Sequence, residues 1–284
     1  FEHNTVAQLA PHLTNLEMSF SLNDRIIPLS TQKDKKPIFC IHPGAGFGTV
    51  YQELAKAYGP TRSIWGIQAK GLANDEIPES SIREMASDYI NLIKSVQKEG
   101  SYTLLGWSIG GRIAHEIATQ LEHEGDLVDQ VILLDTQTPD NSEIAITNES
   151  FEESAKNLFH KWQDGANEID SASINTHIER VKYLKAQLLK DGLIPSESPD
   201  ELVEQVLRQL INNSSILADH ALVQVKAPLI LFKAGIRNGA EKEVMAWDQY
   251  TRGGITEIVI NTSHYRMLDP EPARIIAEHL KKLL

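Results

Sequence analysis

Six short apolar runs recur along the chain, and segments with helical periodicity separate them. The runs are rich in β-branched and aromatic residues, as expected of strands that are buried on both faces. They lie at 38–42, 63–67, 102–107, 131–135, 229–233 and 256–260. The intervening segments with apolar residues at spacings of three and four lie at 49–58, 81–98 and 109–123. This alternation predicts an α/β fold whose mainly parallel sheet is flanked by helices on both sides. Residues 26–29 are expected to add an edge strand.

One region, at about 140–222, departs from the alternation because it contains no strand-like run. Three stretches in it have helical patterns, at 151–162, 173–190 and 200–219. We interpret the region as a helical insertion above the sheet that forms a lid over an active site. The alternative is a helical layer that only packs against the sheet.

Length, charge and cysteine content exclude several classes of protein. The 284 residues, 41% of them apolar, suffice for one α/β domain with an insertion. Since 39 acidic residues outnumber 27 basic ones, the electrostatic footprint of a nucleic-acid-binding protein is missing. No apolar stretch is long enough to cross a bilayer and no leader is visible, so a cytoplasmic protein without a membrane partner is expected. The single cysteine, Cys40, excludes an internal disulfide, and no clustered ligand pattern predicts a metal site.

The strongest local motif is the stretch 106–111 (GWSIGG), which follows one predicted strand directly and opens a predicted helix. A serine at such a turn projects its hydroxyl from the carboxyl end of the sheet, and the glycines around it avoid collisions with the strand and the helix. Ser108 is therefore the candidate nucleophile, against the alternative of a turn that merely contains a serine. The N–H of Ile109, at the start of the helix, is a candidate oxyanion donor.

A second oxyanion donor is expected from the loop 42–48 (HPGAGFG), which follows an earlier strand. Its glycines allow the backbone N–H groups to turn toward a substrate, so either Gly44 or Ala45 is the candidate donor. A phosphate-binding loop is the alternative, but the spacing fits neither a Walker loop nor a dinucleotide fingerprint. His42 is interpreted as a structural neighbour and not as a catalyst.

The general base should be a histidine that follows the nucleophile and an acidic residue in the chain. His264 comes just after the last predicted strand, where a loop brings it to the same edge as Ser108. His220 is the second choice. The other histidines after the nucleophile and outside its first helix are His160, His177 and His279.

Asp135 is the candidate acid because it ends the predicted strand that follows the nucleophile. Many α/β-hydrolases carry this acid after the next strand instead. There the chain reads 233–239 (KAGIRNG), without a carboxylate until Glu241. A loop aspartate that caps a turn is the alternative interpretation of Asp135.

Taken together, these motifs resemble a type I thioesterase domain from the end of a nonribosomal peptide synthetase, over about residues 36–284. The first ten residues (FEHNTVAQLA) resemble the closing helix of a peptidyl carrier domain, and the absence of an initial methionine suggests a piece of a longer chain. We therefore expect a carrier remnant and linker at 1–25, and the thioesterase domain at 26–284.

The resemblance implies a mechanism in which a peptidyl or acyl thioester on the phosphopantetheine arm of an upstream carrier domain acylates Ser108, with His264 as base and Asp135 as acid. No cofactor bound by the domain itself is implied. Water, or an amine or hydroxyl of the same chain, would release the product. Trp107, next to the nucleophile, would either line the acyl pocket or pack in the core.

Two rival functions are compatible with the same residues. One is a stand-alone editing thioesterase or general esterase with the same triad, against which the carrier-like start argues. The other is a catalytically inactive hydrolase fold that docks carrier domains, against which the complete set of Ser108, Asp135 and His264 argues.

Overall fold

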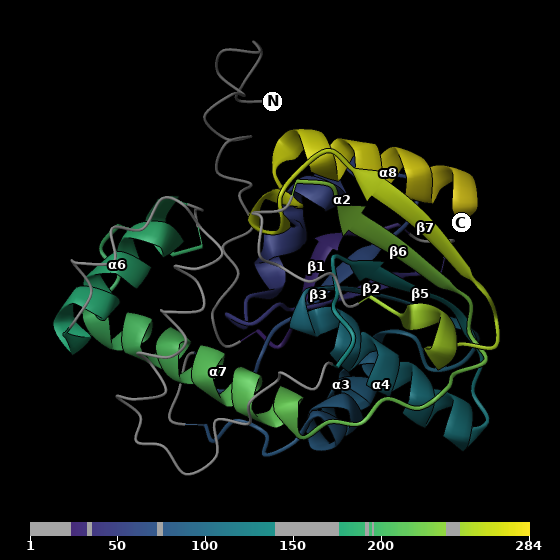
Figure 1. Ribbon diagram of the computed structural model, residues 1–284, viewed down its shortest axis with the longest axis horizontal. Coiled ribbons are helices and arrows are strands. Elements are labelled where there is room, and N and C mark those ends of the chain that lie inside the picture. The colour runs from purple at the N-terminus through teal and green to yellow at the C-terminus, as the bar shows by residue number, and fades with distance from the viewer. Residues whose placement is uncertain are drawn as a thin grey trace, which may run out of the picture.

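The computed structural model describes residues 24–32, 36–72, 76–139, 176–190, 193–194, 196–236 and 245–284. Within these residues, a seven-stranded sheet runs in the order β1-β3-β2-β4-β5-β6-β7 (Figure 1). Its strands are β1 (Ile26–Ser30), β2 (Ile38–Ile41), β3 (Ile64–Ile67), β4 (Tyr102–Trp107), β5 (Val128–Leu134), β6 (Leu229–Ala234) and β7 (Ile255–Ile260). Only β1 pairs antiparallel, with β3, and every other neighbouring pair is parallel.

Helices cover both faces of this sheet (Figure 1). On one face lie α2 (Gln52–Tyr58), which continues the short helix η1 (Gly48–Tyr51), and α8 (Pro270–Leu283). On the other lie α3 (Ile82–Val96) and α4 (Ile109–Glu124). Successive residues of the central strands pack on opposite faces of the sheet. Ile132 packs toward α2 and α8, whereas Leu133 packs toward α3 and α4. Because helices cover both faces of the sheet, the sequences of the inner strands are continuous apolar runs.

Two further helices, α6 (His177–Lys190) and α7 (Asp200–Ala218), pack together beside the sheet. They bury an apolar cluster of their own, which includes Val203 and Leu207 and reaches Phe47 and Ala69. The described part of the predicted insertion therefore lies against the loop that follows β2.

The predicted fold class is confirmed, and the predicted strands differ from the observed ones only at their ends. β5 begins at Val128, earlier than the predicted 131, and the edge strand predicted at 26–29 is β1. The predicted helices at 173–190 and 200–219 correspond to α6 and α7. The predicted helix at 151–162 and residues 1–23 lie outside the described residues.

Candidate active site

The candidate nucleophile, Ser108, lies between β4 and α4 in a conformation that few residues adopt. Its backbone angles are φ 57° and ψ −128°, outside the region favoured by side-chain-bearing residues. The turn is held on both sides, because the Ser108 N–H donates to Leu134 O at 3.0 Å and Gly111 N–H donates to Ser108 O at 3.1 Å. Backbone strain of this kind persists where the surrounding structure over-determines it.

Two glycines of the motif make this turn possible. A Cβ on Gly106 would lie 2.1 Å from the carbonyl carbon of Gly110, so the strand and the helix could not approach each other. A Cβ on Gly111 would lie 2.0 Å from Thr136 Oγ1. The motif therefore encodes the close approach of three backbone segments around Ser108.

Asp135, directly after β5, is the other non-glycine residue with positive φ, at 46°, among the described residues. It is 1% exposed, and its N–H donates to Phe232 O at 2.7 Å. The carboxylate accepts hydrogen bonds from Ala234 N–H, at 2.8 Å on Oδ1, and from His264 Nδ1, at 2.7 Å on Oδ2. The neighbouring strand β6 and the histidine together fix its orientation.

His264 opens the short helix η4 (His264–Arg266) after β7, and its side chain is 24% exposed. With Nδ1–H donated to Asp135, the other ring nitrogen, Nε2, carries the lone pair that a general base needs. The ring of Trp107 lies 5.7 Å from the His264 ring, between centroids, while Trp107 also packs against the core cluster beneath α2 and α8.

The three candidate residues lie at one edge of the sheet because they follow the carboxyl ends of the parallel strands β4, β5 and β7. Trp107 is paired with Leu134 in the β4–β5 register, so Ser108 and Asp135 leave the sheet at the same level. β6 and β7 continue the sheet on the far side of Asp135 and bring His264 back to it.

The candidate oxyanion groups also lie near one another. A Cβ on Gly44 would lie 4.0 Å from Ile109 Cγ2, so the loop 42–48 borders the start of α4. Among the described residues, the N–H groups of Gly44 and Ala45 donate to no backbone carbonyl. Ile109 is the first residue of α4, where an N–H has no partner within the helix.

His42 is fully buried and bonds within the core, as the sequence interpretation of a structural neighbour requires. Its Nδ1 lies 2.8 Å from Pro43 O, and its Nε2 contacts the Tyr89 hydroxyl. Burial lowers the pKa of His42 to about 4, so the ring is neutral at physiological pH.

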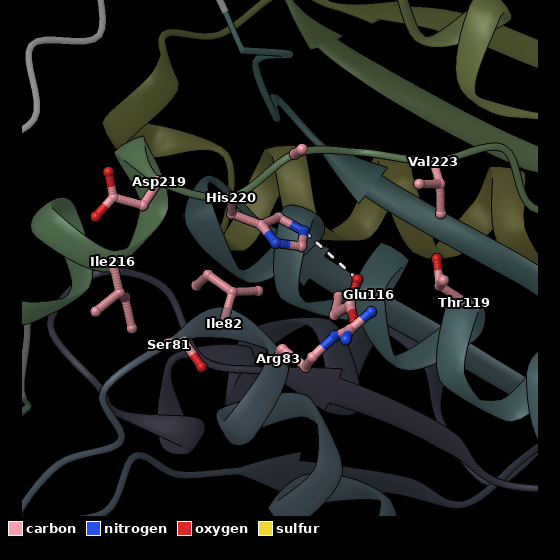
Figure 2. Close-up of a pocket in the computed structure, with 10 residues that line it drawn as sticks. Ser81, Ile82, Arg83, Glu116, Thr119, Ile216, Asp219, His220 and Val223 are labelled. Atoms are coloured by element: carbon pink, nitrogen blue, oxygen red, sulfur yellow. Dashed lines mark ion pairs between the residues drawn. The ribbon is translucent and has the colours of Figure 1, made fainter.

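His220, the second choice for the base, lies at a different place. It lines a cavity of about 290 Å³ between α3, α4 and the end of α7 (Figure 2), and its Nε2 lies 3.6 Å from Glu116 Oε2. Burial lowers the pKa of His220 to about 4 and raises that of Glu116. His177 contacts Glu204 and His279 lies near Phe232, whereas His160 is outside the described residues.

Two searches confined to the described residues gave negative results. No group of three or more His, Cys, Asp and Glu side chains is arranged to hold a metal ion. In the same part of the chain, no helix combines the length and the apolar character that crossing a membrane requires.

Comparison with known proteins places the chain among thioesterase domains. The family model of the thioesterase domain matches residues 36–284. The dimodular nonribosomal peptide synthase of Bacillus subtilis (strain 168) is 30% identical over 292 residues, which are 100% of this chain and 12% of that protein. Malpibaldin synthetase of Mortierella alpina is 31% identical over 284 residues, 97% of this chain and 5% of that protein. The chain thus spans only a small part of the length of these relatives.

Solved structures share the fold. A four-domain nonribosomal peptide synthetase, holo-AB3403, matches with a TM-score of 0.77 and 22% identity, covering 99% of this chain and 22% of that chain. The surfactin thioesterase domain SrfTE matches with a TM-score of 0.60 and 20% identity, covering 94% of this chain and 97% of that one. The chain therefore belongs to the thioesterase domain family, and the predicted resemblance to type I domains of nonribosomal peptide synthetases is confirmed.

Proposed function

We propose that this domain takes a peptidyl or acyl group from a carrier-domain thioester onto Ser108 and then releases it. The observation that carries the proposal is the 2.7 Å hydrogen bond between His264 Nδ1 and Asp135 Oδ2, on the sheet edge where Ser108 occupies its strained turn. A histidine oriented by a buried carboxylate is what activates a serine hydroxyl. Membership of the thioesterase family supports the coarser statement that the domain is a hydrolase.

In the acylation step, Ser108 Oγ attacks the thioester carbonyl carbon while His264 Nε2 accepts the hydroxyl proton. Asp135 stays ionised and stabilises the imidazolium. The carbon–sulfur bond then breaks, and the imidazolium returns the proton to the departing sulfur. The carrier arm leaves as a thiol, and the acyl group remains as an ester on Ser108.

The negative charge that develops on the carbonyl oxygen needs donors that point at it before the reaction begins. The N–H of Ile109 and that of Gly44 or Ala45 serve as these donors in the proposal. Ile109 is the first residue of α4, so the favourable end of the helix dipole also stabilises this charge.

Release of the ester needs a second nucleophile, which is either water or an amine or hydroxyl of the bound chain. His264 again accepts its proton, so hydrolysis and cyclisation use the same residues. The region 140–222, whose described part contains α6 and α7, acts as the lid that governs access of water. Trp107, whose ring flanks His264, lines the acyl pocket.

The partner in this proposal is a peptidyl carrier domain upstream in the same synthetase. The carrier-like residues at 1–25 support this arrangement, with the thioesterase domain at 26–284, as does the multidomain nature of the matched synthetases. The phosphopantetheine arm belongs to the carrier, and the domain itself needs no cofactor for the steps above.

Intact-protein mass spectrometry after incubation with an acyl-thioester mimic of the carrier arm tests the proposal. We expect an acyl adduct on the wild-type protein that maps to Ser108 and is absent from Ser108→Ala. His264→Ala should form the adduct at least 100-fold more slowly, because the hydroxyl loses its base. If neither adduct nor thiol release occurs with a panel of mimics, including carrier-tethered ones, the domain is an inactive docking module.

A further inference from the structure

A pair of buried amide side chains links α7 to the candidate oxyanion loop. Asn213 is 0% exposed, and its Nδ2 donates to Gly44 O at 2.8 Å. Gln209, one helical turn earlier and 1% exposed, donates from Nε2 to Asn213 Oδ1 at 3.0 Å. Two hydrogen bonds thus run from Gln209 through Asn213 to Gly44, and the second of them joins α7 to the loop across 169 residues of sequence.

The orientation of both amide groups follows from the last acceptor, Gly44 O. A backbone carbonyl can only accept, so Asn213 must turn its NH₂ group toward Gly44. The Asn213 oxygen then faces Gln209, which must donate. Both amides therefore have one arrangement that makes these two hydrogen bonds, and it leaves Gln209 Oε1 buried without a hydrogen-bond partner among the described residues.

This bond constrains the atoms that the proposed reaction uses. Because the peptide unit is planar and trans, holding Gly44 C=O also sets the direction of the Ala45 N–H on the opposite side of the same plane. Leu210 packs on Gly44 from the same helix, 3.2 Å from the position of a Cβ, and limits movement of the loop toward α7. Neither Gly44 N–H nor Ala45 N–H has a backbone acceptor among the described residues that would otherwise orient it.

We propose that Asn213 is a positioning residue for the oxyanion hole. It acts through Gly44 by holding the loop 42–48 in the conformation that aims its N–H groups at the reacting carbonyl. The inference rests on the proposed function of the site and adds to it a residue of the lid region. The same hydrogen bond makes the geometry of the oxyanion hole depend on the position of α7, because displacement of this helix would break the bond that holds the loop.

The test compares Asn213→Asp, which keeps the size and removes the donor, with Asn212→Asp as a matched control. Asn212 is the neighbouring amide on α7, and its Nδ2 donates to Glu79 O at 3.2 Å, away from the oxyanion loop. The substrates are an activated phenyl ester of a short acyl chain and its thiono analogue, in which sulfur replaces the carbonyl oxygen. Sulfur accepts hydrogen bonds weakly, so the thiono ester gains little from an oxyanion hole.

We expect Asn213→Asp to lower kcat for the oxygen ester by about 10- to 100-fold with little change in KM, and to lower the thiono rate by less than about threefold. Asn213→Ala should give the same fall in the oxygen-to-sulfur rate ratio, and Asn212→Asp should leave the ratio at the wild-type value. Thermal unfolding of each variant monitors the fold, and because the ratio is internal to one sample, it does not depend on the folded fraction.

An unchanged ratio in both Asn213 variants overturns the inference, even if their rates fall, because a general loss of structure lowers both rates together. An equal fall of the ratio in Asn212→Asp also overturns it. Failure of the proposed function has a different signature, since Ser108→Ala would then retain the esterase activity of the wild type.

Discussion

Ser108 and Asp135 are the two non-glycine residues with positive φ among the described residues, and both lie at the candidate active site. Their side chains leave the sheet after the paired ends of β4 and β5, where ordinary backbone angles would direct them elsewhere. Residues in such conformations cluster at functional sites because their strain costs about 1–3 kcal/mol and is otherwise avoided. The strain therefore supports the assignment of Asp135 independently of its bond to His264.

Asp135→Asn tests the assignment of Asp135 as the catalytic acid, because it replaces one carboxylate oxygen with an NH₂ group. Asparagine tolerates positive φ, so the backbone should keep its conformation. Asp135 accepts from both Ala234 N–H and His264 Nδ1, and asparagine has only one oxygen with which to accept. The amide NH₂ then faces His264 Nδ1 and favours the wrong tautomer. We expect kcat to fall on the order of 10³- to 10⁴-fold with the fold retained, measured by steady-state kinetics and circular dichroism. A fall of less than about tenfold would contradict the role of Asp135.

At the level of elements, a single buried arginine joins the helix of the nucleophile to the end of α7. Arg112 of α4 is 1% exposed, and its guanidinium donates to Leu217 O at 2.9 Å and to His220 O at 3.1 Å. Leu217 lies in the last turn of α7 and His220 follows the helix, so the guanidinium lies at its carboxyl end, where positive charge is favourable. Arg112 therefore anchors this end of α7, while Asn213 holds the same helix to the oxyanion loop.

Arg112→Met should destabilise the domain by about 2–4 kcal/mol, because the methionine fills only part of the volume, removes the Arg112 donor from His220 O and leaves Leu217 O with backbone donors alone. Urea unfolding measures the loss. Arg83→Met is the control: Arg83 is 85% exposed, 3.9 Å from Glu116, and its loss should cost less than about 1 kcal/mol. Equal stability of the two variants would show that the carbonyls of α7 find other partners.

At the level of the whole molecule, stability depends on pH because burial lowers the pKa of three histidines, His42, His115 and His220. Burial lowers the pKa of both His42 and His220 to about 4, against about 6.5 in an unfolded chain. Between these values the unfolded state binds more protons than the folded state. The contribution of these histidines to the free energy of unfolding is therefore complete above about pH 6.5 and is lost as the pH falls toward 4.

His42→Gln should flatten this dependence. Relative to the variant, the wild-type protein should lose about 3 kcal/mol more of its unfolding free energy between pH 7 and pH 4, measured by urea unfolding at each pH. The comparison is made between two proteins because burial raises the pKa of Glu79 and Glu116, which stabilises the folded state in acid and opposes the trend. Parallel pH profiles for the two proteins would mean that His42 titrates normally in the folded state.

Several features follow from the local order of residues along the chain and could be predicted without the structure. Apolar periodicity records which faces are buried, so the alternation of strands and helices and the mainly parallel sheet were predictable. The stretch 106–111 predicted the turn at Ser108, because glycine is the residue that permits backbone segments to meet there. Chain order and a position after the last strand were enough to select His264.

Contacts between side chains that are distant in the sequence, in contrast, emerged only from the folded structure. The bond between Asp135 and His264 spans 129 residues, and it depends on how β5, β6 and β7 align in the sheet. His220 met the requirement of chain order, yet it lies beside Glu116 in a separate cavity. No sequence pattern pointed to Asn213, because a polar residue in an amphipathic helix is normally expected to face solvent. Its role became visible only from the packing of α7 against the loop that contains Gly44. The physical reason is common to these cases: periodicity reports burial, whereas a hydrogen bond between side chains is set by the packing of segments that are far apart in sequence.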